Sequence, residues 1–496
     1  MGPRSMLLNL DMKSATHCSS GFEHPWVSKD FGRLSNNRAN ESLFRHFRSP
    51  TELQELNFQV TTAFVSVSTL PILDECATIA NKMLHEGALY IFFNKLRIYL
   101  QSPVSLVFIF EGPSKPRIKR GHQVQGHHEP WWFKLAKELI QYFGYHVREA
   151  PGEAEAELAN LNCLGLINRV ITSDSDVLIF GAKLVFRILS NKNRNFDDEF
   201  MVYSDEVLEK NHSLTLGSMV LIALSSGGNY DEGIAGCGLS TAQALARCGF
   251  GDELLKAACI LNEDRLKCFL VYWRLVLQKE LATNSKNMLG SCQPTLAAAI
   301  PPAFPNPAIL KLYTNPITSS SIGFSLPNTK SWVGREPFIH ELAQFCSDYF
   351  GWKTEAMLKA KFESLLWEGV FLQMLYSPLS LYNLETKSLC TPNTHATILS
   401  ISHGIRKGQY RMKMGDGKHP KITVRTDNFI SLMGEGFAAS SGDNSIKVWV
   451  SKRAFKTSTP EDLQRWSMDQ PVASSSHAEL KNFHEVIDLT NVDGDD

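Results

Sequence analysis

Acidic residues follow several apolar segments of this 496-residue sequence at short spacing. Glu111 ends the run FIFEG, Glu153 and Glu155 lie in APGEAEAE, and Asp174 and Asp176 lie in TSDSD. Carboxylates that gather in one pocket repel one another unless cations neutralise them. Oxygen ligands without histidine or cysteine favour Mg²⁺ or Mn²⁺ over zinc. The pattern therefore predicts a site for two divalent ions, of the kind that activates water for attack on a phosphodiester.

Each acidic pair also has a simpler interpretation, because acidic side chains commonly just face water. Asp174 and Asp176 are two residues apart and would project to the same face of an extended segment. The joint position of all five acids after apolar runs favours one shared pocket over separate solvated charges.

The segments that carry these acids predict an α/β domain. The run FQVTTAFVSVSTL from Phe58 has strand-like alternation, apolar residues from Leu89 to Leu100 recur at helical spacing, and SLVFIFEG is typical of a buried parallel strand. Residues 131–182 then alternate between helix and strand. This order predicts a parallel sheet with helices on both faces, with ligands beyond the carboxyl ends of the strands.

Composition divides the rest of the chain into further parts. Apolar periodicity is weak at both ends, and Pro, Ser, Thr and Asn are dense between two helical stretches. We expect an atypical or disordered N-terminus (1–55), the α/β domain (56–212), a helical, glycine-containing region (213–282), a linker (283–330), a C-terminal helical and β-rich module (331–435) and a disordered tail (436–496).

The overall composition argues against several classes of protein. Lys and Arg number 50 and Asp and Glu 51, so any nucleic-acid binding must come from local patches. The ten cysteines include no C-x-x-C pair, which argues against a zinc ribbon or a compact disulfide framework, and most are expected to be buried thiols. Apolar runs are too short for a membrane helix and the first residues lack a secretory signal, so we expect an intracellular protein that does not contact membranes.

A glycine-rich turn is the first of two patterns that could bind phosphate. Gly233, Gly236 and Gly238 precede a helix expected to begin near Ser240 and Thr241. Backbone N–H groups and a helix N-terminus at this place could hold a DNA phosphate. A glycine turn before a helix is also a common loop, since glycine occurs wherever φ is positive. Its position directly after GGNYD favours the phosphate-binding interpretation.

Basic residues form the second pattern. Four basic residues follow Glu111: Lys115, Arg117, Lys119 and Arg120. Four contacts with phosphate groups would make DNA binding strongly salt-dependent. Such a run of basic residues is also often only a solvated loop. A further group lies on the β-rich module: Arg406, Lys407, Arg411, Lys413, Lys418, Lys421 and Arg425. Trp131 and Trp132 are expected to pack inward rather than to stack on bases.

Several segments resemble the XPG family of structure-specific nucleases. FIFEGPSKPRIKRG resembles the end of the family's N-terminal block, APGEAEAELANLNCLGLINRVITSDSDVLIFGA its internal block, and SGGNYDEGIAGCGLSTAQALARCGFGDELL its glycine-rich DNA-binding segment. LKLYTNP, residues 332–350 and LLWEGVFLQML resemble the fungal Holliday-junction-resolving branch, so the resemblance covers roughly residues 60–435.

This resemblance implies a PIN-like nuclease domain, a helix-two-turn-helix region and a small chromodomain-like module. It implies a nuclear enzyme that uses two Mg²⁺ or Mn²⁺ ions to cut branched DNA, such as 5′ flaps or Holliday junctions, in repair or recombination. Glu111, Glu153, Glu155, Asp174 and Asp176 correspond to its metal-binding acids.

The sequence departs from the family pattern at three acidic positions. Glu111 stands where the family usually has Asp, Ser66 in VSVS stands where it has its first metal-binding Asp, and Asn229 in GGNYD replaces another Asp. Asn229 still offers a carbonyl oxygen to a metal, but affinity depends strongly on ligand charge. Two hypotheses follow: a metal-dependent endonuclease, or a paralogue that binds branched DNA without cutting it. A metabolic α/β enzyme is disfavoured, since the chain has no G-x-G-x-x-G or P-loop motif.

The C-terminal sequence HEVIDLTNVDGDD places apolar side chains in an acidic context. Val486, Ile487 and Leu489 resemble a SUMO-interacting motif, which would add a short strand to the edge of a partner's sheet.

Overall fold

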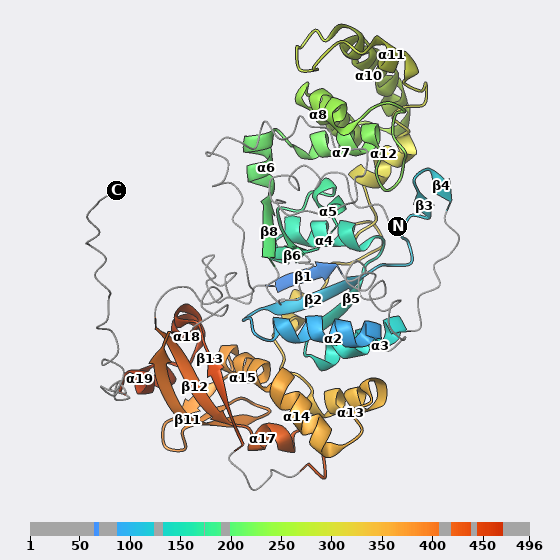
Figure 1. Cartoon of the computed structure of the whole chain (residues 1–496). Coiled ribbons are helices and arrows are strands. Elements are labelled where there is room, and N and C mark those ends of the chain that lie inside the picture. Colours follow the sequence, from blue (N-terminus) through green and yellow to red (C-terminus); the bar gives the residue numbers. More distant parts are fainter. Residues whose placement is uncertain are drawn as a thin grey trace, which may run out of the picture.

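The computed structural model describes residues 64–68, 87–123, 132–172, 174–189, 199–405, 418–437 and 444–469. Figure 1 shows a central sheet between a helical region at one end and a helical and β-rich module at the other. The predictions for residues 1–55, Trp131 and the SUMO-interacting motif lie outside the described residues.

The central sheet has six strands in the order β5-β2-β1-β6-β7-β8. All neighbouring pairs are parallel except β7 and β8, which are antiparallel. The strands are β1 (Phe64–Ser68), β2 (Ser105–Phe110), β5 (His146–Glu149), β6 (Arg169–Ile171), β7 (Leu184–Leu189) and β8 (Glu199–Ser204). The predicted α/β class with a largely parallel sheet is therefore confirmed.

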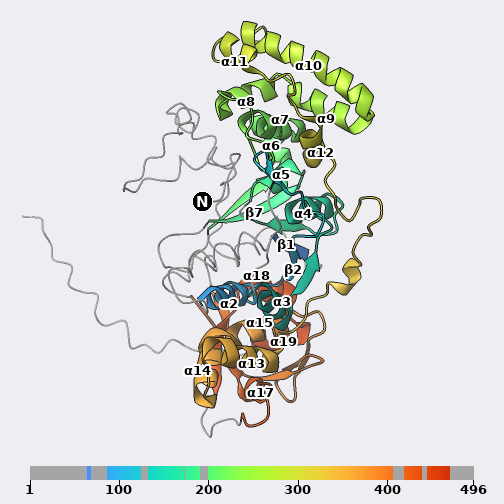
Figure 2. The ribbon, with the colours of Figure 1, turned by 90° about the vertical axis from the view of Figure 1, so that its right-hand side faces the viewer.

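Strand β2 explains why the sheet has a core on each face. Its six residues are all buried, and successive side chains alternate between two apolar clusters. Leu106, Phe108 and Phe110 pack with helices α2 (Gly87–Tyr99) and α3 (Trp132–Tyr142), whereas Val107 and Ile109 pack with α4 (Ala154–Cys163). Figures 1 and 2 show the strands between these two layers.

Helices that follow β8 form the helical region at the top of Figure 1. They are α6 (Asp205–His212), α7 (Leu216–Ser226), α8 (Leu239–Arg247), α9 (Phe250–Ile260), α10 (Glu263–Thr283), α11 (Pro294–Ala299) and α12 (Pro307–Thr314). Helix α7 is buried along most of its length and joins the region to the core that covers α4.

The expectation of a linker over residues 283–330 is wrong for its first two thirds, which contain α11 and α12. Helix α11 packs on α10, and α12 packs on α7 and α9, with Leu296, Leu310 and Tyr313 buried. The polar and proline-rich composition arises from helix starts: Pro307 is at the first turn of α12, and the Asn306 side chain accepts a hydrogen bond from Ala308 N.

The C-terminal module combines helices with a five-stranded antiparallel sheet of order β13-β12-β11-β10-β9. Its elements are α13 (Ile339–Phe350), α14 (Glu355–Leu365), α15 (Trp367–Tyr376), β9 (Leu381–Asn383), β10 (Ser388–Cys390), β11 (His395–Gly404), β12 (His419–Arg425), α17 (Asp427–Ser431), β13 (Ser445–Trp449), α18 (Lys452–Ser458) and α19 (Glu461–Asp469). It shares one apolar cluster with α2, and Gln373 Nε2 donates to the carbonyl oxygens of Leu100 and Ser102 at 2.8 and 2.9 Å.

The expected start of a disordered tail at residue 436 is also wrong. Strand β13 completes the small sheet, and Val448, Val450 and Leu463 are buried in its core. The many polar residues of this stretch obscure a short strand and two short helices that depend on the module for burial.

Two minor expectations can be compared with the described residues. Trp132 packs against the core, as expected. The expectation that most cysteines are buried is wrong, since four of the eight described free cysteines are exposed: Cys163, Cys259, Cys268 and Cys292. Among the described helices, none is long and apolar enough to cross a membrane.

A segment that we call the strap, residues 315–338, runs alongside the sheet from α12 to α13 and contains the 3₁₀ turn η4 (Thr329–Ser331) (Figure 2). It covers the edge of the sheet: Ser105 Oγ donates to Trp332 O at 3.2 Å, and His146 Nε2 lies 2.8 Å from Val333 O. Gly152 permits the close approach, because a Cβ there would lie 2.6 Å from Ile317 O.

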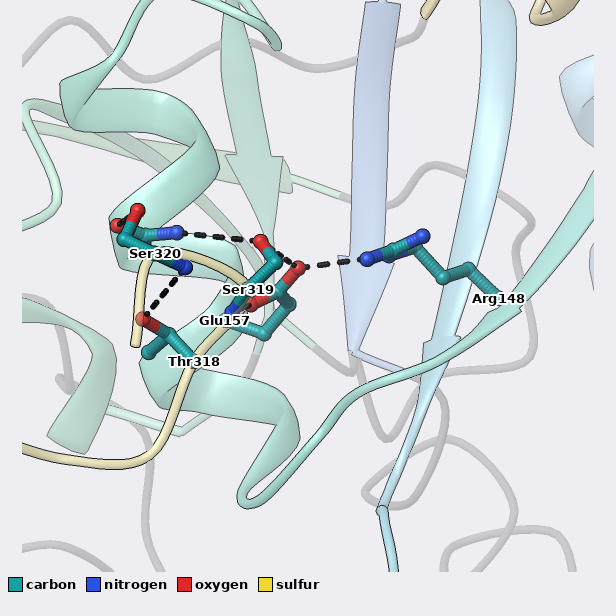
Figure 3. Close-up of polar contacts among 6 residues, drawn as sticks. Arg148, Glu157, Thr318, Ser319 and Ser320 are labelled. Carbon is teal, nitrogen blue, oxygen red and sulfur yellow. Dashed lines mark hydrogen bonds and ion pairs between the residues drawn. The ribbon is translucent and has the colours of Figure 1, made fainter. Parts of the chain in front are cut away.

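A buried carboxylate joins the strap to helix α4. Glu157 accepts hydrogen bonds from Ser319 N at 2.8 Å and Ser319 Oγ at 2.7 Å, and its Oε1 lies 3.4 Å from Arg148 Nε (Figure 3). Glu157 is fully buried, so these contacts compensate the loss of water around its charge. The strap therefore fixes the position of α4, whose first turn carries Glu155.

Candidate active site

The five predicted acids lie at one edge of the central sheet, after the carboxyl ends of three parallel strands. Glu111 follows β2, Glu153 and Glu155 lie at the start of α4 after β5, and Asp174 and Asp176 follow β6. Strands β5 and β2 are neighbours, and β6 lies beyond β1 in the same sheet. We call these five residues the acid cluster.

Glu111 joins the end of β2 to the start of α4. Its Oε2 accepts a hydrogen bond from Ala154 N at 2.9 Å, which satisfies a free N–H group of the first helical turn. Its Oε1 lies 2.7 Å from Lys115 Nζ. Gly112 allows this turn to pack closely, since Gly112 N donates to Gly152 O at 2.7 Å and a Cβ would lie 1.8 Å from Ala150 O.

Glu153 is buried and accepts a hydrogen bond from the hydroxyl group of Tyr230. Burial, together with the negative charges of Glu111 and Asp174, raises the pKa of Glu153 to about 7, against the effect of the Tyr230 hydrogen bond. The shift shows that Glu111, Glu153 and Asp174 interact electrostatically.

Asp174 and Asp176 are brought together by a helix start, not by the extended segment that the sequence predicted. Helix α5 (Asp176–Ile179) begins at the second acid, and Asp176 N donates to Asp174 Oδ1 at 3.1 Å. Burial raises the pKa of Asp174, and burial with the charges of Asp174 and Glu153 raises the pKa of Asp176 further. Asp176 Oδ2 is buried and has no hydrogen-bond partner among the described residues.

Lys115 connects Glu155 with the other acids. Burial disfavours its charge, but the negative charges of Glu111, Glu153 and Glu155 outweigh burial and raise the pKa of Lys115. Lys115 thus interacts with Glu111, Glu153, Glu155 and Asp174, and Asp176 interacts with Glu153 and Asp174, so these contacts connect all five acids.

The donor atoms of the cluster suit a hard divalent cation. They are carboxylate oxygens, and the partnerless Asp176 Oδ2 is a buried anionic oxygen that a cation would stabilise. Within the described part of the chain, no three His, Cys, Asp or Glu side chains already stand as a coordination shell. Lys115 and Tyr230 engage oxygens of Glu111 and Glu153 instead. Metal binding would therefore require these side chains to rearrange.

Ser66 lies in β1, between β2 and β6, where its backbone is paired in register with Val107 and Val170. This central strand is the one on which the family resemblance places a first acidic ligand, so the substitution falls inside the sheet that carries the cluster.

The basic residues after Glu111 form a two-stranded hairpin of β3 (Ile118–Lys119) and β4 (His122–Gln123). Positive φ at Arg120 (48°) and Gly121 (74°) is typical of a tight type I′ turn. Arg120 N donates to Asn229 O at 2.8 Å, so the hairpin is bound to the GGNYD segment. Arg117, Lys119 and Arg120 are exposed, whereas Lys115 lies in the acid cluster. The four predicted DNA-binding residues are thus divided between two environments.

The glycine turn leads into helix α8, which begins after Gly238 without a side-chain cap. Gly233 and Gly236 both have φ of +83°, and a Cβ on Gly233 would lie 2.4 Å from Gly227 N. Gly236, Gly238 and Ser240 are exposed. Thr241 is half-buried and accepts a hydrogen bond from Gln293 Nε2 at 3.2 Å. The first turn of α8 therefore offers N–H groups to solvent.

Two tyrosines and a glutamine near these sites were not predicted. Tyr230 contacts Glu153, its ring lies 4.7 Å from that of Tyr313, and the charge of Asp176 acts on both tyrosines. Tyr230 lies in GGNYD and Tyr313 lies in LKLYTNP, two motifs that the sequence analysis had noted. Their positions in these motifs could have indicated a role in the site. Gln293 lies in the segment expected to be a linker, where no signal pointed to a role.

The second basic group is only partly described. Arg406, Lys407, Arg411 and Lys413 lie outside the described residues. Lys418, directly before β12, and Arg425, the last residue of β12, are exposed, and Lys421 Nζ lies 5.5 Å from the ring centre of Trp449. Arg425 Nε is 3.5 Å from Asp427 Oδ2.

Comparison with known proteins agrees with this arrangement. The XPG I-region family model matches residues 144–229, which include four of the five acids and Asn229. The mouse DNA excision repair protein ERCC-5 is 30% identical over 237 residues, covering 46% of this chain and 18% of that protein. The Flap endonuclease GEN-like 1 of Oryza sativa subsp. japonica is 40% identical over 119 residues, covering 24% of this chain and 18% of that protein. These matches support the XPG/flap endonuclease family for this chain.

The fold agrees with that of a solved structure, the Holliday junction-resolving enzyme GEN1 in complex with product DNA and Mg²⁺. The TM-score is 0.62 at 22% identity, covering 87% of this chain and 98% of that one. The alignments with ERCC-5 and the rice protein reach less than a fifth of those proteins' lengths. The likeness to these two relatives, a DNA excision repair protein and a flap endonuclease, is therefore limited to the aligned segments.

Proposed function

We propose that the chain is a structure-specific endonuclease that cuts branched DNA, a 5′ flap or a Holliday junction, in nuclear DNA repair or recombination. The observation that supports it most is the acid cluster at the carboxyl edge of a parallel sheet, where burial and neighbouring acids raise the pKa values of Glu153 and Asp176. Such a concentration of negative charge is typical of a cation-dependent active site.

In this proposal Glu111, Glu153, Glu155, Asp174 and Asp176 hold two Mg²⁺ or Mn²⁺ ions, with Asn229 as a further oxygen donor. The ions would supply an activated water molecule and stabilisation of the leaving oxygen. The chain's own residues position the rest: Tyr230 holds Glu153, and Glu111 holds the start of α4.

Two flanking elements would bind the DNA backbone. The hairpin presents Arg117, Lys119 and Arg120 to solvent, and its turn is bonded to the segment that leads into the glycine turn. The first turn of α8, with exposed Ser240 and an orienting hydrogen bond from Gln293 to Thr241, would bind a phosphate through backbone N–H groups. DNA held between these elements would pass the acid cluster.

A second candidate function is binding of branched DNA without cleavage. It is favoured by Ser66 in the central strand and by Lys115, whose ammonium group already neutralises part of the cluster. Neither feature affects the hairpin or the glycine turn, so DNA binding would persist without catalysis.

The deciding experiment incubates the purified chain with labelled flap and four-way-junction DNA in Mg²⁺, Mn²⁺ or EDTA. The proposal expects divalent-ion-dependent cleavage that Asp176→Asn abolishes, with Glu253→Gln on the exposed side of α9 as the control. Binding without cleavage in every condition would favour the second function. In that case Ser66→Asp together with Asn229→Asp should restore cutting, and its failure would contradict the assignment of these two positions.

The sequence also suggests a protein partner, SUMO or a sumoylated protein, bound through Val486, Ile487 and Leu489. Ile487→Ala should weaken capture of the chain by immobilised SUMO without changing DNA binding. Equal capture of both chains would contradict this partner.

A further inference from the structure

Lys115 stands apart from the rest of the basic cluster. Its Nζ lies 2.7 Å from Glu111 Oε1 and its side chain is 26% exposed, whereas Arg117, Lys119 and Arg120 face solvent. The negative charges of the acid cluster, not those of a single acid, act on its ammonium group. Lys115 is thus a cation that the chain itself supplies to the cluster.

The backbone around Lys115 holds the side chain in this direction. Ser114 N donates to Pro151 O at 3.1 Å, and Lys115 N donates to Gly112 O at 3.3 Å. The turn is therefore bonded to the segment that leads into α4. These bonds fix the backbone of Lys115 beside Glu111, within reach of the 2.7 Å ion pair.

One ammonium group does not satisfy five acids. Asp176 is 6% exposed, and its Oδ2 has no hydrogen-bond partner among the described residues. A buried carboxylate oxygen without a donor is costly unless a cation or proton reaches it. Asp176 therefore still lacks a positively charged partner in the part of the chain that the structure describes, whereas Lys115 makes its ion pair with Glu111.

We propose that Lys115 is an internal cation that competes with divalent metal ions for Glu111 and so lowers the metal affinity of the acid cluster. The inference rests on the proposed function, since it concerns the metal that this function requires. An ion that takes Glu111 as a ligand must displace the ammonium group, because both need the same carboxylate oxygens.

The competition also links metal binding to DNA binding. A DNA phosphate beside the hairpin attracts the ammonium group away from Glu111 and frees that carboxylate for a metal ion. By thermodynamic linkage, metal binding then strengthens DNA binding by the same factor. The chain would bind metal weakly when alone and more tightly when its substrate is in place.

The test measures Mn²⁺ binding to the DNA-free chain by electron paramagnetic resonance of the unbound ion. Lys115→Met keeps the length of the side chain and removes its charge, and we expect it to bind Mn²⁺ about tenfold more tightly, or about 1.4 kcal/mol. Lys119→Met, which removes an exposed charge from the adjacent hairpin, is the matched control and should bind Mn²⁺ as the unmodified chain does.

Equal or weaker Mn²⁺ binding by Lys115→Met would overturn the inference. Lys115→Gln gives the same comparison if circular dichroism shows that the methionine variant does not fold, and Lys115→Arg, which keeps the charge, should bind Mn²⁺ weakly. Mn²⁺ binding that is measurable but identical in all variants contradicts the role of Lys115 alone. Failure of every variant to bind Mn²⁺ contradicts both this inference and the metal-dependent function.

Discussion

At Glu153, burial and neighbouring negative charge act in the same direction on the carboxyl group. Burial removes water from the carboxylate, and Glu111 and Asp174 add repulsion, so the pKa rises from 4.5 to about 7. Glu153 therefore binds its proton more tightly in the folded chain than in the unfolded chain. An acid whose pKa is raised by folding contributes its full stabilisation at pH values below the pKa that it has in the unfolded chain. This contribution is lost as the pH rises through the pKa that the acid has in the folded chain.

The corresponding prediction concerns stability in metal-free buffer. Glu153→Gln, which keeps a neutral side chain of the same shape, should be more stable than the unmodified chain at pH 8 by about 3 kcal/mol and no more stable at pH 4. Urea unfolding in EDTA at both pH values measures the difference. Glu253→Gln on α9 is exposed and should show no such trend. A difference that is constant with pH would contradict the buried, charge-coupled environment of Glu153.

Helix α4 is the element that brings most of the site together. Glu111 contacts its first N–H group, Glu153 and Glu155 lie at its start, and Glu157 one turn later is held by the strap and by Arg148. The position of the cluster thus depends on hydrogen bonds between α4 and a segment more than 150 residues away in sequence.

Removal of one hydroxyl group tests the contact between strap and helix. Ser319→Ala deletes the donor 2.7 Å from the buried Glu157 Oε1 and should lower the free energy of unfolding by about 1–3 kcal/mol. Ser320→Ala, in the adjacent exposed position, removes only a surface hydrogen bond to Asn160 and serves as the control. Denaturant unfolding measures both. Equal effects of the two substitutions would show that the strap does not hold α4.

A glycine substitution tests the close approach of the strap. Gly152→Ala places a Cβ 2.6 Å from Ile317 O, a backbone atom that cannot turn away, and should destabilise the chain by about 1–3 kcal/mol. Gly334→Ala lies in the same strap with open space around its Cβ and should be nearly neutral. Thermal unfolding compares the two variants. A neutral Gly152→Ala would mean that the strap does not approach the start of α4 this closely.

At the scale of the whole molecule, the hairpin and the glycine turn are joined through the segment around Asn229. The hairpin turn donates hydrogen bonds to Asn229 O and Tyr230 O, and the glycine turn follows a few residues later. Exposed positive charge and exposed helical N–H groups are therefore held at a fixed separation, although the chain carries almost no net charge. DNA affinity should come from this local arrangement.

Salt dependence of DNA binding measures the contribution of the hairpin. Replacing Arg117, Lys119 and Arg120 by alanine should weaken junction binding and reduce the slope of log K against log salt by about 0.9 for each phosphate that is no longer neutralised. Lys353→Ala, in an exposed position of the C-terminal module, should leave the slope unchanged. Fluorescence anisotropy over a range of KCl concentrations gives both slopes. An unchanged slope in the triple variant would place the DNA elsewhere.

The sequence predicted the elements that depend on local pattern and missed those that depend on distant contacts. The apolar run of β2 could be predicted because short periodicities indicate burial, and the acids that follow apolar runs could be recognised by their position. Helices α11 and α12 and strand β13 were missed because polar caps and prolines dominate their composition, and their few apolar residues are buried only by remote partners.

The same limit applies to the contacts within the site, which the sequence did not indicate. Lys115 counted as one of four DNA-binding residues by its place in a basic run, but the turn around Gly112 directs its side chain to Glu111. The contact between Tyr230 and Glu153 joins residues 77 positions apart, so no sequence spacing could have indicated it. The types of the acidic residues were predictable, whereas their immediate partners were not.

The most direct test of metal binding by the acid cluster is a crystal of the chain soaked in Mn²⁺, with anomalous scattering measured at the manganese absorption edge. We expect an anomalous peak among the carboxylates of Glu111, Glu153, Asp174 and Asp176, with the Lys115 ammonium group displaced from Glu111. A map with no peak at the acid cluster, with Lys115 still bound to Glu111, would contradict it.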